Sequence, residues 1–242
     1  MELYKSLVLP PGPRGSFPVI LGHCIYSHVL WRGYEEAQRL QDVKEGKPQG
    51  EADSPFYTPV AGYFCYGYGG GTVRDWAMAQ PPAAFTNGDV LLGWVWGYIA
   101  IHFTNDTLYN MCKAGTAFNP IKGIVMGLDA IDTAGGVCAS VDKAAKLFPD
   151  NPQAPFLGGM LISLGGSLFR YMDQKARGKQ VKTEWAKPTA VFKRGLFYTL
   201  LYLSLKKWSG DASWSRLTVV TMHLIRVMMS NAAGIEILPF LV

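Results

Sequence analysis

Two short motifs in this chain place an arginine one helical turn after a group of small residues. The first is Gly69–Arg74, which reads Gly-Gly-Gly-Thr-Val-Arg, and the second is Gly165–Arg170, which reads Gly-Gly-Ser-Leu-Phe-Arg. Both motifs lie inside apolar segments, where each glycine weakens a helix by roughly 1 kcal/mol and a charged side chain is costly in lipid. Such a pair of interruptions, each with a fixed charge, is typical of a site or a pathway between two repeats of a membrane protein.

Each motif also has a simpler interpretation. Glycine pairs allow two helices to pack closely, without any other role. Arg74 and Arg170 could each lie near a helix end and extend to the membrane interface, and Asp75 could neutralise Arg74. Both interpretations stay open at the level of the sequence.

A second group of candidates lies in an apolar segment between the two motifs. Asp129 and Asp132 are three residues apart and therefore share one face of a helix, where they could attract cations or share a proton. The alternative is an interhelical salt bridge, for example from this pair to Lys122, Arg216 or Arg226. We favour the salt bridge.

Histidines and arginines occur in the other apolar segments. Arg216, His223 and Arg226 are seven and three residues apart, so they share a helix face that is expected to meet a partner or anionic head groups. His23 and His102 are isolated, and we expect each to be a hydrogen-bonded packing residue rather than a ligand.

The composition indicates a membrane protein. Of 242 residues, 49% are hydrophobic and 17% are charged, against about 25% charged in a typical soluble domain. Mean hydropathy is +0.09, which charged loops and internal glycines keep low. Seven segments have about the 20 residues needed to cross a bilayer. They are Phe17–Arg39, Phe56–Met78, Val90–Cys112, Pro120–Ala145, Pro155–Met172, Pro188–Leu205 and Trp214–Ala233.

The seven segments predict an all-α fold of two triplets and a seventh helix. An odd number of spans in each repeat inverts the second repeat relative to the first, and the glycine motifs then fall in the middle helix of each triplet. We therefore predict one transmembrane domain over 1–242, with glycine-kinked helices two and five. Its repeats cover about 16–112 and 118–206, and its seventh helix covers about 213–234.

Several function classes are not supported. Hydrolase, Walker A, zinc-protease and dinucleotide-binding motifs do not occur, so we expect no enzyme. The four cysteines are scattered without a C-x-x-C pair, so we expect no metal site and no cofactor. The net charge of +5 forms no basic stripe interleaved with aromatics, which argues against nucleic acid.

The order of several short motifs resembles the TRIC family, the trimeric intracellular cation channels. The most specific match is Tyr68–Gly71 followed by Ala79–Phe85, which resembles the glycine kink of the second helix and the Pro-Pro-x-Ala-Phe loop after it. Asp106–Tyr109, Asn119–Lys122 and Gly165–Ser167 resemble the third helix, the entry to the fourth and the kink of the fifth.

The resemblance implies a multi-pass protein of an intracellular organelle membrane, a homotrimer with one pore in each protomer, and potassium-selective counter-ion flux. It implies the endoplasmic reticulum, with a mitochondrial or other organelle left open, and a bound phosphoinositide near the fourth helix. The chain departs from the family pattern at three positions. Asp129 and Thr133 stand where the family has the lysine and arginine that hold this lipid, and Ile162 stands where it has an arginine.

Two functions follow from these observations. The first is a potassium-type cation channel of an intracellular membrane, with a phospholipid as its only expected ligand. The second is a non-conducting, TRIC-fold accessory subunit of a larger organellar membrane complex, which the lost basic residues favour. The candidate pore or kink residues are Gly69, Gly70, Gly71, Arg74, Gly165, Gly166, Ser167 and Arg170, and the candidate charge site is Asp129, Asp132 and Lys122.

A double replacement tests the two arginines. If they set the electrostatics of a pore, Arg74→Ala combined with Arg170→Ala changes the unitary conductance or the ion selectivity in bilayer recordings. Currents identical to those of the wild type would remove both residues from the pore.

Overall fold

The computed structural model describes residues 16–44, 46, 57–113, 119–176 and 189–241. These residues form ten α-helices, one π-helix and one 3-10 helix, and no strand occurs among them, which confirms the all-α expectation. The elements are α2 (Phe17–Lys44), α3 (Tyr57–Gly62), η1 (Tyr63–Gly67), α4 (Gly69–Ala77), α5 (Ala83–Thr86), α6 (Gly88–His102), α7 (Thr107–Lys113), α8 (Pro120–Leu147), α9 (Ala154–Ala176), α10 (Ala190–Ser209), α11 (Ala212–Ala233) and η2 (Pro239–Leu241).

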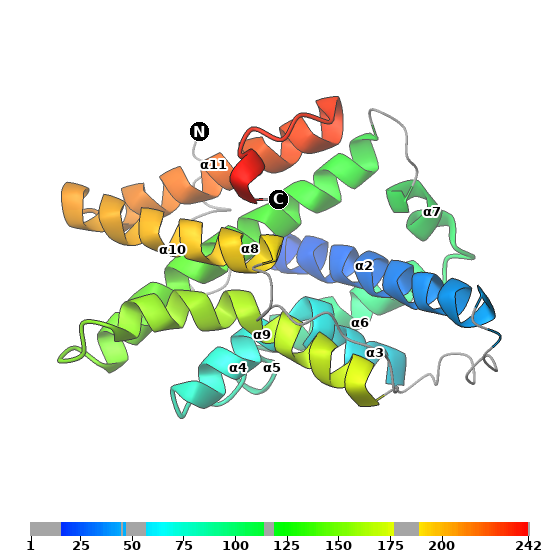
Figure 1. Ribbon diagram of the computed structural model, residues 1–242, viewed down its shortest axis with the longest axis horizontal. Helices are drawn as coiled ribbons and strands as arrows, with labels where there is room; N and C mark the ends of the chain where they lie inside the picture. Colours follow the sequence, from blue (N-terminus) through cyan, green and yellow to red (C-terminus); the bar gives the residue numbers. More distant parts are fainter. Residues whose placement is uncertain (1–15, 45, 47–56, 114–118, 177–188, 242) are drawn as a thin grey trace.

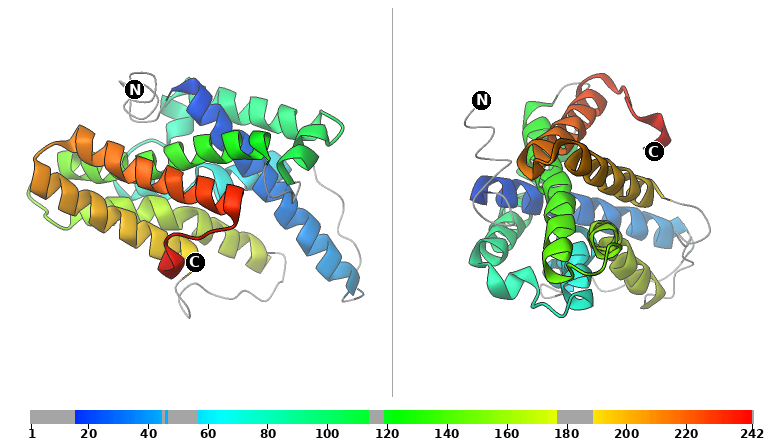
Figure 2. Two further views of the ribbon diagram at one scale, coloured as in Figure 1. Left: turned by 90° about the horizontal axis from the view of Figure 1, so that it is seen from above. Right: turned by 90° about the vertical axis from the view of Figure 1, so that its left-hand side faces the viewer.

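The long helix α8 lies in the middle of the bundle (Figures 1 and 2) and packs against α2, α9, α10 and α11. Its buried positions are mostly small, including Gly127, Ala130 and Ala134. Small side chains let neighbouring helices approach from several sides, which suits a central helix. Asn119 begins α8, because its side chain accepts a hydrogen bond from the amide of Lys122 at 3.0 Å.

Corresponding helices of the two predicted repeats pack against one another. The first helices, α2 and α8, are in contact, and so are the middle helices, α4 and α9. A two-fold relation between repeats would produce this pairing of like with like. The inverted relation and the repeat boundaries at about 112 and 118 stay predictions.

The second predicted span is interrupted, as expected, whereas the fifth is not. The second consists of α3, the π-helix η1 and α4, and Tyr68 separates the last two with φ −108° and ψ 15°. The amide of Tyr68 donates to the carbonyl of Tyr63 at 2.7 Å, a π-type bond that ends η1. In contrast, α9 continues through Gly165 and Gly166 as one helix, so the fifth span is not interrupted, and its glycine kink stays a prediction.

The third predicted span, Val90–Cys112, is also not one helix. Helix α6 ends at His102, and a turn with positive φ at Asn105 (46°) and Asp106 (64°) leads into the short helix α7. A left-handed pair of this kind cannot continue a helix. Each of the other five predicted spans corresponds to one helix, and the predicted and observed ends differ by a few residues. Pro188, the predicted first residue of the sixth span, lies outside the described residues.

The two glycine motifs meet where α4 crosses α9. A Cβ atom on Gly70 would lie 1.7 Å from the carbonyl oxygen of Ile162, and one on Gly165 would lie 2.6 Å from the Cα of Gly70. The two backbones are therefore in direct contact, which only glycine permits. Beside the crossing, the rings of Phe64 and Phe169 pack with centroids 4.8 Å apart.

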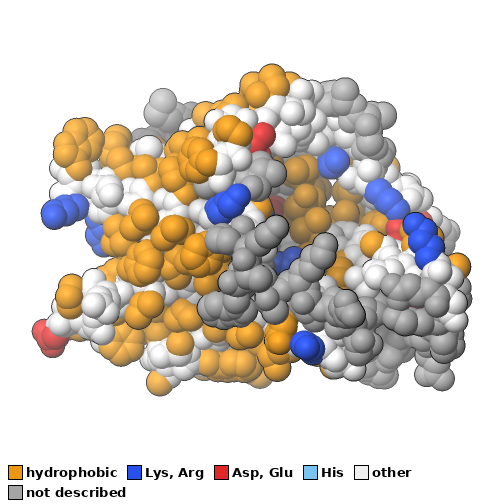
Figure 3. Space-filling view, in the orientation of Figure 1, with side chains coloured by type: hydrophobic (Ala, Val, Ile, Leu, Met, Phe, Trp, Pro, Cys, Tyr) orange, Lys and Arg blue, Asp and Glu red, His pale blue; other side chains and the backbone are white. Residues whose placement is uncertain are grey.

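The outer faces of the helices are rich in exposed hydrophobic side chains. Figure 3 shows them gathered over α9 and α10, and they include Leu157, Leu168 and Leu200. A contiguous apolar surface of this kind suits contact with lipid. Judged by length and composition alone, α8 is the one helix within the described ranges that is apolar enough to cross a bilayer. The number of seven spans stays a prediction.

The crossing gives a test of the packing. Gly70→Ala is expected to destabilise the protein by at least about 1–3 kcal/mol, because the added methyl group has no room beside the Ile162 carbonyl. Thermal unfolding in detergent measures the effect. Gly88→Ala is the matched control, since a Cβ there meets nothing within 4 Å. Equal stability of the two variants would contradict the close crossing.

Candidate functional site

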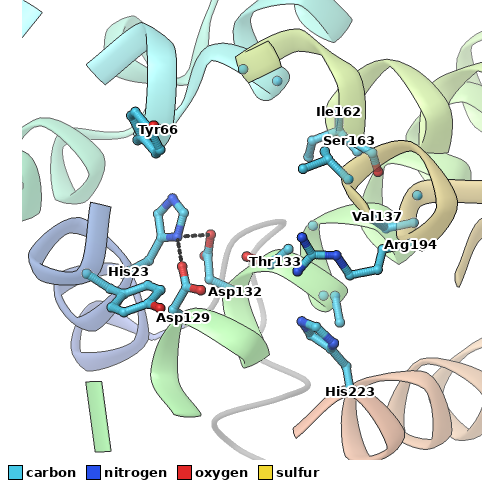
Figure 4. A pocket seen from close by; sticks show the side chains of 18 of the residues that line it. His23, Tyr66, Asp129, Asp132, Thr133, Val137, Ile162, Ser163, Arg194 and His223 are labelled. Atoms are coloured by element: carbon cyan, nitrogen blue, oxygen red, sulfur yellow. Dashed lines mark hydrogen bonds and ion pairs between the residues drawn. The ribbon is translucent and has the colours of Figure 1, made fainter. Parts of the chain in front are cut away.

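A cavity of about 570 Å³ lies between the two predicted repeats (Figure 4). Its walls come from α2, the η1–α4 segment, α8, α9, α10 and α11. Both glycine motifs contribute, through Gly70, Gly71 and Arg74 on one side and through Gly166, Ser167 and Arg170 on the other. The structure therefore has a cavity between the two motifs, and its role as a site stays a prediction. Gly69 and Gly165 lie at the crossing beside it.

An acidic cluster forms the wall where α2 meets α8. His23 of α2 places its Nδ1 atom 2.7 Å from Oδ1 of Asp129 and 3.8 Å from Oδ2 of Asp132 (Figure 4). Both aspartates thus share one helix face, as their spacing predicts. The predicted interhelical contact of the pair is present, but its partner is His23 and not Lys122, Arg216 or Arg226. The expectation that His23 is a hydrogen-bonded residue of the packed interior is confirmed.

Lys122 does not join this cluster. It lies seven residues before Asp129, or about two helical turns, at the beginning of α8 and outside the lining of the cavity. Its amide is held by Asn119, and its side chain forms no ion pair with a described carboxylate. The predicted site of three residues is therefore reduced to the two aspartates.

Arg74 is buried and compensated by charge. Its Nε and Nη2 atoms donate to Oδ1 of Asp75 at 2.9 and 2.5 Å, and its Nη1 donates to Ser140 Oγ at 2.7 Å. Lys143 of α8 donates to the same Asp75 oxygen at 2.9 Å. Asp75 therefore neutralises Arg74, as expected, and ties α4 to α8 at the edge of the cavity.

Arg170 occupies the equivalent position in the second motif but has different neighbours. Its Nη2 atom donates to Ser167 Oγ at 3.0 Å, and its guanidinium lies 4.8 Å from the ring centroid of Tyr66. A cation over an aromatic face is stabilised without an opposite charge. The two arginines are thus both cavity residues, one paired with a carboxylate and one resting on a tyrosine.

A basic wall lies opposite the acidic cluster, where α10 meets α11. Arg194 and His223 point into the cavity across from Asp129 (Figure 4). His223 lies 2.9 Å from the hydroxyl of Tyr198, and Arg226 binds the carboxylate of Glu236 through two nitrogens. The polar face of α11 therefore turns inward to the cavity. The expectation that this face meets a partner or anionic head groups stays a prediction.

The comparisons with known proteins bear on this arrangement. A family model described as TRIC channel matches residues 52–233. The chain belongs to the TRIC channel family. This is a family of channels and not of enzymes, which confirms the expectation that the chain has no catalytic role. No curated protein matches the sequence.

Solved TRIC structures have the same fold. A trimeric intracellular cation channel from C. elegans without Ca²⁺ has a TM-score of 0.68 at 16% identity, over 97% of this chain and 95% of that one. A TRIC counter-ion channel studied for its activity in calcium release has a TM-score of 0.65 at 19% identity, over 88% and 93%. The C. elegans channel with bound Ca²⁺ has a TM-score of 0.64 at 17% identity, over 90% of each chain.

The departures from the TRIC pattern are concentrated at the cavity. Asp129, Thr133 and Ile162, which stand where the resemblance places a lysine and two arginines, all line it. In this chain the fourth-helix side of the cavity is therefore acidic and polar rather than basic. Sequence reasoning did not place His23 or Arg194 at the site, although a polar side chain in an apolar segment is a signal for a partner in the bundle interior.

The Asp75 network is open to a stability test. Asp75→Asn leaves Arg74 and Lys143 without their carboxylate, and since Asp75 is 1% exposed, we expect a loss of about 3–5 kcal/mol. Asp142→Asn is the matched control. Its pair with Lys206 is more than a third exposed, and an asparagine still accepts from Tyr202, so about 1 kcal/mol or less is expected. Similar losses in thermal unfolding would contradict a buried network.

Proposed function

We propose that the chain forms a cation channel of an intracellular organelle membrane, which conducts monovalent cations such as potassium as counter-ions. The observation that carries the proposal is the cavity between the glycine motifs, with the carboxylates of Asp129 and Asp132 on its wall. Conduction is a property of the similar C. elegans protein by its description, a trimeric intracellular cation channel. By the same likeness we propose a homotrimer.

Burial of charge supports a hydrated cavity. A charge at the centre of a membrane span costs at least about 2.5–3.5 kcal/mol on insertion scales, so such groups face a bundle interior or water. Here Asp129, Asp132, Arg170 and Arg194 come from three different helices and face one common space. Paired carboxylates on the wall of a narrow space raise the local concentration of cations.

The route between α4 and α9 is closed in this structure. The backbone contact of Gly70 with Ile162 and the Phe64–Phe169 pair fill it, so ions would have to pass along α8 instead. This observation favours the second candidate function, a non-conducting TRIC-fold subunit of a larger membrane complex. Native mass spectrometry of the particle extracted in mild detergent distinguishes the two. A homotrimer supports the channel, and stable recovery with unrelated subunits supports the accessory role.

A phospholipid is the ligand that we propose for the basic wall. Arg194 and Arg216 line the cavity, and neither forms an ion pair with a carboxylate of the described chain. A phosphate group would compensate them. Mass spectrometry of the lipids that copurify with the protein tests this proposal. The absence of a bound phospholipid from the wild-type protein would refute it.

Removing the acidic pair is the functional test. Asp129→Asn combined with Asp132→Asn is expected to lower the potassium conductance by a factor of about 3–10, because the wall no longer concentrates cations. Single-channel recording in bilayers measures this. Asp150→Asn, in the exposed turn between α8 and α9, is the control with unchanged conductance. Unaltered currents in the double variant would exclude the acidic wall from the pathway.

A further inference from the structure

His23 joins three elements through its two ring nitrogens. Its Nδ1 atom lies 2.7 Å from the Asp129 carboxylate, and its Nε2 atom lies 3.2 Å from the carbonyl oxygen of Gly67. Gly67 is the last residue of η1, directly before the interruption at Tyr68. The ring is buried, with 7% of the residue exposed. One side chain of α2 thus connects the interruption of the second span to the acidic pair of α8.

The number of protons on this ring follows from its partners. A carbonyl oxygen only accepts hydrogen bonds, so the contact with Gly67 requires a proton on Nε2. An ionised carboxylate also only accepts, so the contact with Asp129 requires a second proton, on Nδ1. Imidazole is a stronger base than a carboxylate, so this second proton belongs to the ring. With Asp129 ionised, a neutral imidazole, which has one N–H, could satisfy only one of the two partners.

We propose that His23 is an imidazolium cation that acts as a positioning residue, which holds Gly67 and the acidic pair together. With its charge, the cluster of His23, Asp129 and Asp132 has a net charge of −1 instead of −2. Asp129 is occupied by this bond. Asp132, at 3.8 Å, is beyond hydrogen-bond distance and remains available to the cavity.

A net charge of −1 suits monovalent better than divalent ions. A wall of charge −2 would bind a divalent cation much more strongly, because the attraction grows with the product of the charges. This inference deepens the proposed function: the charge of the cluster bears on conduction only if the chain is the proposed channel. The other charged and titratable side chains that line the cavity are Tyr26 on α2, Cys65 and Tyr66 on η1, Tyr68 between η1 and α4, Arg74 on α4, Arg170 on α9, Arg194 and Tyr198 on α10, and Arg216, His223 and Arg226 on α11.

Nitrogen NMR of the histidine-labelled full chain tests the proton count directly. At neutral pH, His23 is expected to show protons on both ring nitrogens. His28 is an internal reference, because it has one partner, the carbonyl of Trp94 at 3.2 Å, while its Nδ1 is without one in the described structure. It should show one protonated nitrogen. A single protonated nitrogen on His23 would overturn the proposal. The signal of His23 is assigned by its loss in His23→Gln. If that variant does not fold, the signal is assigned by replacing the other three histidines, which leaves His23 alone in the spectrum.

Charge compensation separates this role from simple packing. We expect His23→Gln to bind Mn²⁺ about tenfold more tightly than the wild type in electron paramagnetic resonance titrations of the purified chain. Adding Asp132→Asn restores the net charge of −1 and should return the affinity to the wild-type value. His102→Gln, which lies outside the cavity, is the control.

The outcomes are distinct from those of the channel proposal. An unchanged Mn²⁺ affinity in His23→Gln, or a tighter binding that Asp132→Asn does not reverse, would overturn the inference. In bilayers, block by Mn²⁺ should follow the same order among the variants. A wild-type chain without any current would refute the proposed function, while the NMR and binding results would still decide the charge of the cluster.

Discussion

The arrangement of this protein depends on the direct backbone contact between α4 and α9. Because Gly70 and Gly165 have no side chains, the two helices approach until the Cα atom of Gly70 lies against the backbone of α9 at Gly165. The approach brings Arg74 and Arg170 to the same cavity from different halves of the chain. A side chain larger than hydrogen at Gly70 would push the helices apart and separate the two walls. The glycine motifs therefore permit close packing and also contribute to the lining of the cavity.

Charge compensation is the second constraint, and it follows from the first. The cavity contains more ionisable groups than an apolar bundle tolerates without partners. The structure pairs several of them locally, as Asp75 with Arg74, Asp129 with His23, and Arg226 with Glu236. The pairs leave an acidic wall facing a basic wall. Such a space attracts water and ions, and the proposed conduction and the proposed lipid are two ways of using it.

The sequence predicted the helical class and the TRIC resemblance, because these depend on composition, period and motif order, and it drew attention to the two glycine motifs that line the cavity. It did not predict which glycine motif interrupts its helix. Tyr68 adopts a non-helical conformation after a π-helix, whereas Gly165 lies in the continuous helix α9, which packs directly against α4. The partner of Asp129 was also wrong, since distances between α2 and α8 depend on packing and not on spacing along the chain. The turn at Asn105 and Asp106 did have a signal, the polar cluster Thr104–Thr107, but it was outweighed because the first half of the segment is apolar.

The most direct test of the account is whether water and ions reach the middle of the cavity. Thr133 lies there on α8 (Figure 4), and Thr199 is a fully buried threonine outside the lining. In reconstituted protein, a charged methanethiosulfonate reagent should modify Thr133→Cys and change its potassium current. It should leave Thr199→Cys unmodified. Both variants are made in a Cys65→Ala background, which is the blank, because Cys65 lines the same cavity while the other three cysteines are buried outside its lining. Failure to modify Thr133→Cys, or modification without an effect on the current, would contradict an ion pathway through the cavity.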